Sequence, residues 1–182
     1  MTDASVDLGE GPETVAIRFA TRDDAPIMKN IFNKEVAEST SSWEWFPLSN
    51  DDWREWFHEH TRDQHVLLVA EISGEVVGFA GYGAFRSKDG YITTVEDSVF
   101  LKDGCRGRGV GTKLLTRLLA EARARGVHSM VAAVTSENQA SVALHTSLGF
   151  VQAGRLPQVG HKFGRWLDLL LLQIILDDRP VP

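Results

Sequence analysis

The fold is decided by residues 99–112, Val99-Phe-Leu-Lys-Asp-Gly-Cys-Arg-Gly-Arg-Gly-Val-Gly-Thr112. An apolar, β-branched run from Thr93 to Leu101 predicts a strand, and the pattern that follows predicts a helix beginning at Lys113. Between them lies a loop with four glycines and two arginines. Glycines let the backbone approach a ligand closely, and the first N–H groups of a helix have no partners inside it. The stretch therefore predicts a site for an anion such as a phosphate.

Two common phosphate-binding motifs do not fit this loop. A nucleoside-triphosphate P-loop needs a lysine after its second glycine, and Val110 stands there, after Gly109. A dinucleotide-binding fingerprint needs a third glycine where this chain has Thr112, and an acidic residue at the end of the next strand, 129–134, which has none. The loop does match R-x-x-G-x-G over 106–111, although Arg- and Gly-rich loops also occur as plain turns.

Composition points to one globular domain outside the membrane. The chain has 182 residues, of which 43% are hydrophobic and 24% charged. No apolar stretch reaches the roughly 18 residues of a membrane span. The acidic start of the chain does not resemble a signal peptide, so we expect a flexible tail at 1–14, one domain at 15–177 and a short tail at 178–182.

Charge and cysteine content narrow the class further. A net charge of −6 argues against general nucleic-acid binding. Cys105 is the only cysteine, which excludes an intrachain disulfide and predicts a cytoplasmic protein.

Periodicity predicts the order β-α-α-β-β-β-α-β-α-β-β. The strands are expected at 16–20, 66–72, 76–82, 93–101, 129–134, 150–158 and 166–176. The helices are expected at 25–38, after caps at 49–52, from 113 until Gly126, and at 138–148. This order predicts an α/β domain in which a mixed sheet of about seven strands carries helices on both faces.

The R-x-x-G-x-G loop resembles the pyrophosphate loop of the GCN5-related N-acetyltransferase (GNAT) superfamily, which binds acetyl-CoA. Within it, six ordered segments resemble the phosphinothricin and methionine sulfone/sulfoximine acetyltransferases. They are Ile17-Arg-x-Ala-Thr, Glu38-Ser-Thr-Ser-Ser-Trp43-Glu44, Phe85-Arg86 to Tyr91, Thr94-Val-Glu96-Asp-Ser-Val, Asn138 to Phe150, and Gly160-x-Lys162-Phe-Gly-Arg-Trp166-x-Asp168. The resemblance covers about 15–176 and implies the GNAT fold. It also implies acetyl transfer to a small amino-acid-like amine, by direct attack in a ternary complex.

The same resemblance implies which residues hold acetyl-CoA. The strand residues would pair with the pantetheine arm, and the loop would hold the pyrophosphate. Asn138 would hydrogen-bond the pantetheine, with Ser141 one turn further on; an ordinary helix cap is the alternative for Asn138. The expected set is Val99, Phe100, Leu101, Arg106, Gly107, Arg108, Gly109, Val110, Gly111, Thr112, Asn138 and Ser141. No metal is expected.

Two residues are implied to carry the chemistry. A free amine is mostly protonated near neutral pH, so a base must remove its proton. The resemblance puts Glu96 in this role, and burial in an apolar strand would raise its pKa; a salt-bridged structural glutamate is the alternative. Asp97 points to the opposite face and is the weaker candidate. His145, where many members of the fold have tyrosine, would protonate the departing thiolate, unless it is only a packed side chain.

The acceptor is implied to contact Trp43, Arg86, Ser87, Lys88 and Tyr91. The family usually has Phe-Arg-x-Arg-Pro-x-Tyr, whereas here Lys88 replaces the second arginine, and lysine lacks the two-pronged grip of arginine on a carboxylate. Trp43 is either a pocket wall or part of the core. The acceptor therefore stays open: a protein N-terminus, a polyamine or a drug are alternatives. So is a non-catalytic acetyl-CoA-binding regulatory module, although Glu96 and His145 argue against it.

Two further expectations concern metal and partners. The spacing of His58, His60 and His65 places no pair four residues apart on one helix, which predicts a solvated helix end rather than a metal site. The resembled family is usually dimeric, and the apolar last strand is compatible with a homodimer.

Overall fold

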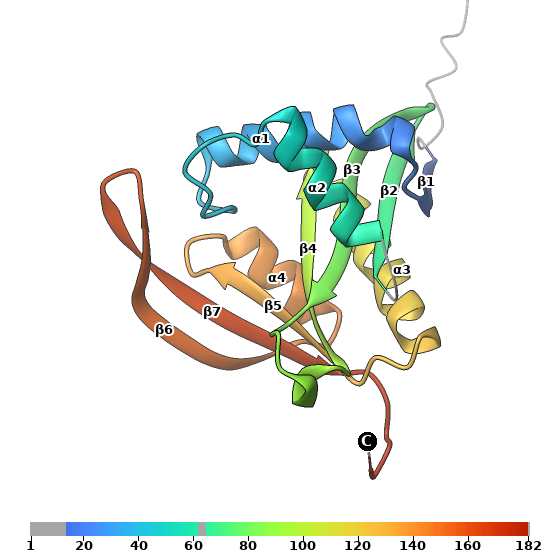
Figure 1. Ribbon diagram of the computed structural model, residues 1–182, viewed down its shortest axis with the longest axis vertical. Helices are drawn as coiled ribbons and strands as arrows, with labels where there is room; N and C mark the ends of the chain where they lie inside the picture. Colours follow the sequence, from blue (N-terminus) through green and yellow to red (C-terminus); the bar gives the residue numbers. More distant parts are fainter. Residues whose placement is uncertain (1–13, 62–64, 182) are drawn as a thin grey trace, which may run out of the picture.

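The computed structural model describes residues 14–61 and 65–181, which form one mixed sheet flanked by α-helices (Figure 1). The strands are β1 (Val15–Phe19), β2 (Val66–Ile72), β3 (Glu75–Ala84), β4 (Thr94–Leu101), β5 (Ser129–Thr135), β6 (Val151–Lys162) and β7 (Arg165–Ile175). The α-helices are α1 (Ala25–Glu38), α2 (Asn50–Thr61), α3 (Val110–Ala124) and α4 (Gln139–Ser147), and short 3-10 helices occur at η1 (Arg22–Asp24) and η2 (Asp89–Tyr91). The predicted order is confirmed. The predicted tail at 1–14 lies, apart from Thr14, outside the described residues.

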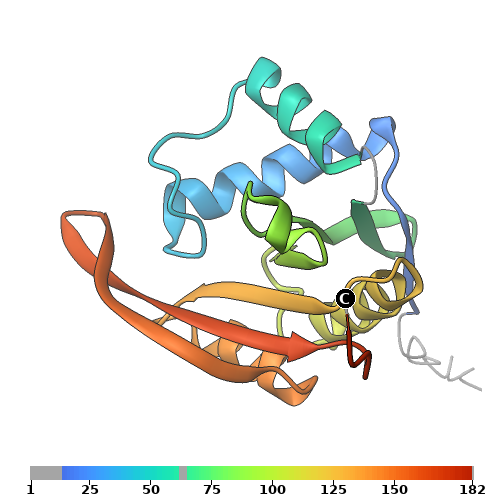
Figure 2. The same ribbon diagram turned by 60° about the horizontal axis from the view of Figure 1, so that its bottom comes forward.

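The sheet has the order β1-β2-β3-β4-β5-β7-β6, and neighbouring strands are antiparallel except β4 and β5. Helices α3 and α4 cover one face, and α1 and α2 cover the other (Figures 1 and 2). Alternation along β2 sends Leu68 into the core under α3 and Leu67 into the core under α1 and α2. Helices on both faces are thus confirmed. Among the described residues, none of the helices has the length and apolar content needed to cross a membrane.

Helix α3 begins earlier than its sequence pattern indicates. Its apolar face is buried as predicted, from Leu114 to Ala122. The predicted start at Lys113 is wrong, because Gly109 is the N-cap, with a φ of 76°, and the first helical residue is Val110. Val110 and Gly111 are both buried, so the first turn belongs to the core rather than to the loop.

Strands β4 and β5 separate half-way along the sheet. They pair from Thr94 opposite Ser129 to Asp97 opposite Ala132, and no further. Beyond this point β4 continues with β3 as far as Leu101, while β5 continues with β7 (Figure 1). The two strands therefore leave a gap at the centre of the sheet, next to α4 and the start of α3.

Strands β6 and β7 extend beyond the sheet as a two-stranded ribbon (Figures 1 and 2). The predicted end of β6 at Gln158 is wrong, because that residue lies in a bulge and the strand continues to Lys162. Gln158 has a φ of 54°, and its amide donates to Oδ1 of Asp168 at 2.7 Å. The carboxylate of Asp168 thereby satisfies a backbone group that the bulge removes from the ladder.

Candidate active site

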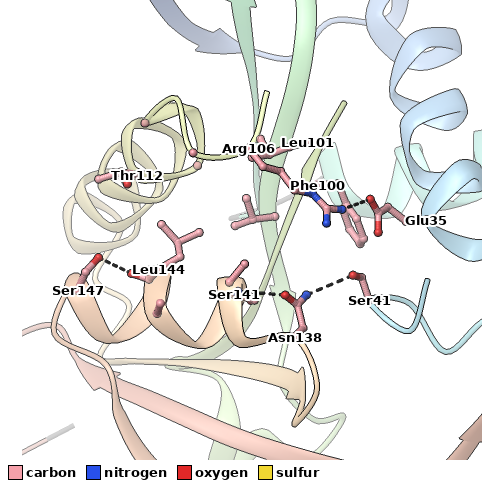
Figure 3. A pocket seen from close by; sticks show the side chains of 16 residues that line it. Glu35, Ser41, Phe100, Leu101, Arg106, Thr112, Asn138, Ser141, Leu144 and Ser147 are labelled. Carbon is pink, nitrogen blue, oxygen red and sulfur yellow. Dashed lines mark hydrogen bonds and ion pairs between the residues drawn. The ribbon is translucent and has the colours of Figure 1, made fainter. Parts of the chain in front are cut away.

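A cavity of about 510 Å³ opens where β4 and β5 separate (Figure 3). One wall is the end of β4, the second is the glycine loop with the start of α3, and the third is α4. Its lining residues are Glu35, Ser41, Val99, Phe100, Leu101, Arg106, Gly107, Gly109, Gly111, Thr112, Asn138, Ala140, Ser141, Ala143, Leu144 and Ser147. All the residues predicted to hold the cofactor are in this set except Arg108, which is exposed, and Val110, which is fully buried in the core.

The glycine loop presents backbone amides to one end of this cavity. Gly104, Gly107 and Gly109 all have positive φ, and space for a side chain is open at each. Because Gly109 is the N-cap of α3 in the left-handed conformation, the amides of 110–112 belong to the first turn of the helix and lack helical partners. The helix dipole adds positive potential at the same place. This end of the cavity can therefore bind a phosphate or diphosphate.

Arg106 reaches across the cavity to Glu35 (Figure 3). Its guanidinium donates to Oε1 of Glu35 near the end of α1. The second oxygen, Oε2, accepts a hydrogen bond of 2.6 Å from the Ser39 hydroxyl. Glu35 is only 7% exposed, so a carboxylate is buried inside a site suited to anions, paired with the arginine of the loop. Sequence reasoning missed Glu35, because its partner is 71 positions away.

Asn138 caps α4 and joins it to the loop after α1. Its Oδ1 accepts from the Ser141 amide at 3.1 Å, as expected for the cap. Its Nδ2 donates to the Ser41 hydroxyl at 3.2 Å (Figure 3). The cap and the place in the cavity coexist, so the two interpretations of Asn138 do not exclude each other.

Glu96 lies half-buried in the middle of β4, directly opposite Gly83 of β3. Its neighbour Val95 packs into the core under α3, so Glu96 points to the other face, which α1 and α2 cover. Burial raises the pKa of the Glu96 carboxyl, and the charge of Arg86 partly opposes this rise. A carboxylate in this state accepts a proton more readily than an exposed glutamate does.

Asp97 and His145 form a buried pair on the opposite face from Glu96. Nε2 of His145 lies 3.0 Å from Oδ2 of Asp97, and Nδ1 lies 2.7 Å from the Ser141 carbonyl oxygen. Burial lowers the pKa of His145, but the hydrogen bond and charge of Asp97 outweigh it, and the pKa lies above its ordinary value. Both ring nitrogens have partners within the chain, which favours a packed, positioning role over direct proton donation. The acid role of His145 stays a prediction.

The predicted acceptor loop follows β3 and contains η2. Arg86, Ser87, Lys88 and Tyr91 are all exposed. The Phe85 ring makes an edge contact with Tyr91 at 5.6 Å between centroids, and the Arg86 guanidinium lies 4.8 Å from the Phe85 centroid. The loop is thus held by its own side chains, with the charge of Arg86 close enough to act on Glu96.

Trp43 lies apart from that loop, against the β6–β7 ribbon. A Cβ atom on Gly160 would come within 2.2 Å of the Trp43 ring, so only glycine fits beneath it. Lys162 is buried, and its Nζ donates to the carbonyls of Ser39 and Ser42 at 2.9 and 2.6 Å. The sequence pattern assigns no role to the segment Gly160-x-Lys162. In the structure it fastens the loop after α1, which lines the cavity, to the ribbon.

Comparison with known proteins identifies relatives over nearly the whole chain. The model of the acetyltransferase (GNAT) family matches residues 28–150. The L-amino acid N-acyltransferase MnaT of Escherichia coli (strain K12) is 45% identical, over 92% of this chain and 98% of that protein. An L-methionine sulfoximine/L-methionine sulfone acetyltransferase of Pseudomonas paraeruginosa is 44% identical, over 90% of this chain and 96% of that protein.

The solved structures include one with a bound cofactor. The structure of yncA from Salmonella typhimurium, with its cofactor acetyl-CoA, has a TM-score of 0.89 and 42% sequence identity. The match covers 92% of this chain and 97% of that one. The open glycine loop, the free amides and the gap between β4 and β5 fit such a cofactor. Among the described residues, no group of His, Cys, Asp and Glu side chains could hold a metal ion.

Proposed function

This chain belongs to the GNAT family and is an acetyl-CoA-dependent N-acetyltransferase, and from that premise we propose that it acetylates a small amino-acid-like amine. Acceptors of the methionine sulfone, methionine sulfoximine or phosphinothricin type are the ones we expect. Two relatives support this choice, since one is named for L-amino acids and another for L-methionine sulfoximine and sulfone.

One observation carries the proposal: the half-buried Glu96 carboxylate, on the face that α1 and α2 cover, is within reach of the positive charge of an arginine. Glu96 has a pKa raised by burial, and the charge of the exposed Arg86 reaches it. An amino acid carries an ammonium group and a carboxylate on one carbon atom, so a negative and a positive side chain that face one site can bind both. Glu96 would take the amine end and Arg86 the carboxylate end, and Lys88 in the same exposed loop would add a second positive charge.

The residues that would hold acetyl-CoA follow from the cavity. The amides from Gly107 to Thr112 would bind the diphosphate, and Val99 to Leu101 would pair with the pantetheine arm along the free edge of β4. Acetyl-CoA supplies the activated acetyl group. The gap between β4 and β5 ends next to Glu96 and Asp97, so the reacting end of the cofactor would lie beside the base.

The reaction we propose is a direct attack within a ternary complex. Glu96 takes a proton from the acceptor ammonium, and the freed nitrogen lone pair attacks the thioester carbonyl. The new C–N bond forms and the C–S bond breaks; the nitrogen gives up a second proton as the amide forms, and the departing thiolate takes up one proton. Cys105 is buried at 6% exposure, which disfavours it as an acyl carrier. Initial rates should give intersecting reciprocal plots; parallel plots, the signature of a covalent intermediate, would contradict this step.

The acceptor class is tested by the release of CoA from acetyl-CoA. L-methionine sulfone, L-methionine sulfoximine, phosphinothricin, the free amino acids and spermidine form the panel. We expect kcat/KM for the best amino-acid acceptor to exceed that for spermidine by about 100-fold or more, as expected for a site that pairs with a carboxylate. A preference for spermidine would contradict the proposal.

We also propose that the protein is a homodimer that pairs through the β6–β7 ribbon. The ribbon exposes large apolar side chains, namely Leu156, Val159, Phe163 and Trp166. His161 makes edge contacts with both Trp45 and Trp166, which extends this apolar surface to the loop after α1. Light scattering after size exclusion should give twice the mass of 20.2 kDa, and Trp166→Glu should lower it. A monomer at micromolar concentration would contradict this proposal. A cytoplasmic location stays a prediction.

A further inference from the structure

His60 lies in the last turn of α2, and one of its ring nitrogens is already hydrogen-bonded to the backbone. Its Nδ1 is 2.8 Å from the Trp56 carbonyl oxygen. A carbonyl oxygen only accepts hydrogen bonds, so the proton is on Nδ1 and Nε2 carries a lone pair. Within residues 14–61 and 65–181, Nε2 makes no hydrogen bond. The sequence predicted a solvated helix end here, and this is wrong for His60, which is half-buried.

The ring is held in a fixed plane by aromatic stacking. His60 stacks on Trp56 with a centroid distance of 3.9 Å and an interplanar angle of 16°. Trp56 in turn stacks on Trp53, at 4.4 Å and 15°. Trp53 is buried in the core between α2 and the sheet. The direction of the Nε2 lone pair is therefore set by the core rather than by a mobile side chain.

The edge of the ring formed by Nε2 and Cδ2 faces the part of the sheet that carries Glu96, since Cδ2 lies 4.0 Å from the position of a Cβ atom on Gly83. Nε2 of His60 lies 3.8 Å from the position of a Cβ atom on Gly83. Gly83 is paired with Glu96, and directly opposite residues in an antiparallel pair project from the same face, with Cβ atoms about 5 Å apart. Gly83 has no side chain, and within the described part of the chain, apart from its chain neighbours, only Nε2 and Cδ2 of His60 come within 4 Å of its Cβ position.

We propose that His60 is a second acceptor-binding residue of the enzyme, whose Nε2 accepts a hydrogen bond from the substrate ammonium while Glu96 takes the reacting proton. This rests on the proposed function, in which Glu96 is the base. An ammonium group has three N–H donors, so two acceptors can hold it at once. One proton passes to the Glu96 carboxylate, and a second N–H stays bonded to His60. The nitrogen lone pair then appears in a fixed direction, and His60 itself gains no proton.

The surroundings of His60 favour its neutral form, which the role requires. Burial lowers the pKa of His60, and the neighbouring His65 lowers it too, against the opposing effects of the Trp56 carbonyl and Glu59. The sheet that His60 faces carries the charged Glu96 on β4, opposite Gly83, and Arg86 follows the end of β3. A neutral imidazole beside a glutamate is suited to receive a cation.

The test compares His60→Phe, His60→Gln and the exposed control His58→Phe, with L-methionine sulfone as the acceptor. His60→Phe keeps a ring that can stack on Trp56 but removes the lone pair, and the amide oxygen of glutamine restores an acceptor near Nε2. We expect His60→Phe to lower kcat/KM by about tenfold to 100-fold, mainly through KM for the acceptor, as expected for a lost charge-assisted hydrogen bond. His60→Gln should recover most of this loss. Acetyl-CoA affinity should be unchanged in all three variants, and His58→Phe should behave like the wild type.

Three outcomes would overturn the inference: an unchanged kcat/KM in His60→Phe, equal losses in His60→Phe and His60→Gln, or a loss that appears in acetyl-CoA affinity. Glu96→Gln separates this inference from the proposed function. If Glu96→Gln is inactive and His60→Phe is normal, only the role of His60 fails. If Glu96→Gln is fully active, the proposed base fails and the His60 role with it. If the wild type does not acetylate L-methionine sulfone, the acceptor assignment fails, and the variants are compared with the best acceptor of the panel.

Discussion

Oδ2 of Asp97 lies 3.0 Å from Nε2 of His145, and this contact separates the roles of two adjacent carboxylates. Glu96 and Asp97 follow each other on β4, so they project from opposite faces of the sheet. Asp97 is 6% exposed and committed to the histidine, whereas Glu96 is half-buried and faces α1 and α2. Of the two carboxylates, Glu96 is therefore the one that we propose takes the proton of the substrate.

Asp97→Asn tests the buried pair through stability. Burial lowers the pKa of His145 and Asp97 raises it, with a net rise. A histidine with a raised pKa in the folded state stabilises the protein fully at pH values below its unfolded-state pKa of about 6.5. This stabilisation is lost as the pH rises through the pKa of the folded state. We expect Asp97→Asn to cost about 1–3 kcal/mol at pH 6 and clearly less at pH 9, measured by denaturant unfolding. A cost that grows with pH would contradict a protonated His145 paired with Asp97.

Arg86→Gln should shift the acid limb of the pH profile of kcat/KM. Burial raises the pKa of Glu96, and Arg86 opposes this rise. Removing the arginine charge should raise that pKa further, so the acid limb of the kcat/KM profile should shift to higher pH. Lys88→Gln is the control for the position of the limb alone, since Lys88 is also exposed but is not among the charges that shift the pKa of Glu96. A shift to lower pH, or an equal shift in both variants, would show that the limb does not report Glu96.

Glu35→Gln should strengthen the binding of acetyl-CoA. The buried Glu35 carboxylate holds Arg106 across the cavity and adds negative charge to a site for an anion. Glutamine removes the charge with little change in shape, leaving Arg106 available to the diphosphate. We expect the Kd of acetyl-CoA to fall by about threefold to tenfold in calorimetry. Weaker binding would mean that the pair instead holds Arg106 ready for the cofactor.

Gly160→Ala should loosen the attachment of the ribbon to the loop after α1. The added methyl group would overlap the Trp43 ring, so we expect a loss of about 1–3 kcal/mol in unfolding free energy. Gly154→Ala is a matched control on the same strand, because a Cβ there meets nothing within 4 Å. Equal stability of the two variants would contradict the contact between Trp43 and Gly160.

Much of this fold is determined by residues that lie close together in the sequence. The hairpin of β2 and β3 turns at Ser73 and Gly74, both with positive φ, as its turn residues predict. Most of the residues predicted to hold the cofactor are equally accessible to sequence reasoning, because 99–112 is one continuous segment that folds as strand, loop and helix, whereas Asn138 and Ser141 lie outside it.

The features that sequence reasoning did not predict depend on contacts between residues far apart in the chain. Glu35 meets Arg106 from 71 positions away, and Lys162 reaches Ser39 over 123 positions. No periodicity encodes such pairs. The burial of His60 escapes sequence reasoning for a related reason: it comes from stacking on Trp56 and from facing Gly83, which lies 23 positions later on β3.

The most direct test of the account is Glu96→Gln, measured both for turnover and for acetyl-CoA affinity. Glutamine is close in size to glutamate but cannot accept the ammonium proton. We predict that kcat falls by about 100-fold or more while the Kd for acetyl-CoA stays within about twofold of the wild type. Turnover close to that of the wild type, at unchanged acetyl-CoA affinity, would contradict Glu96 as the base.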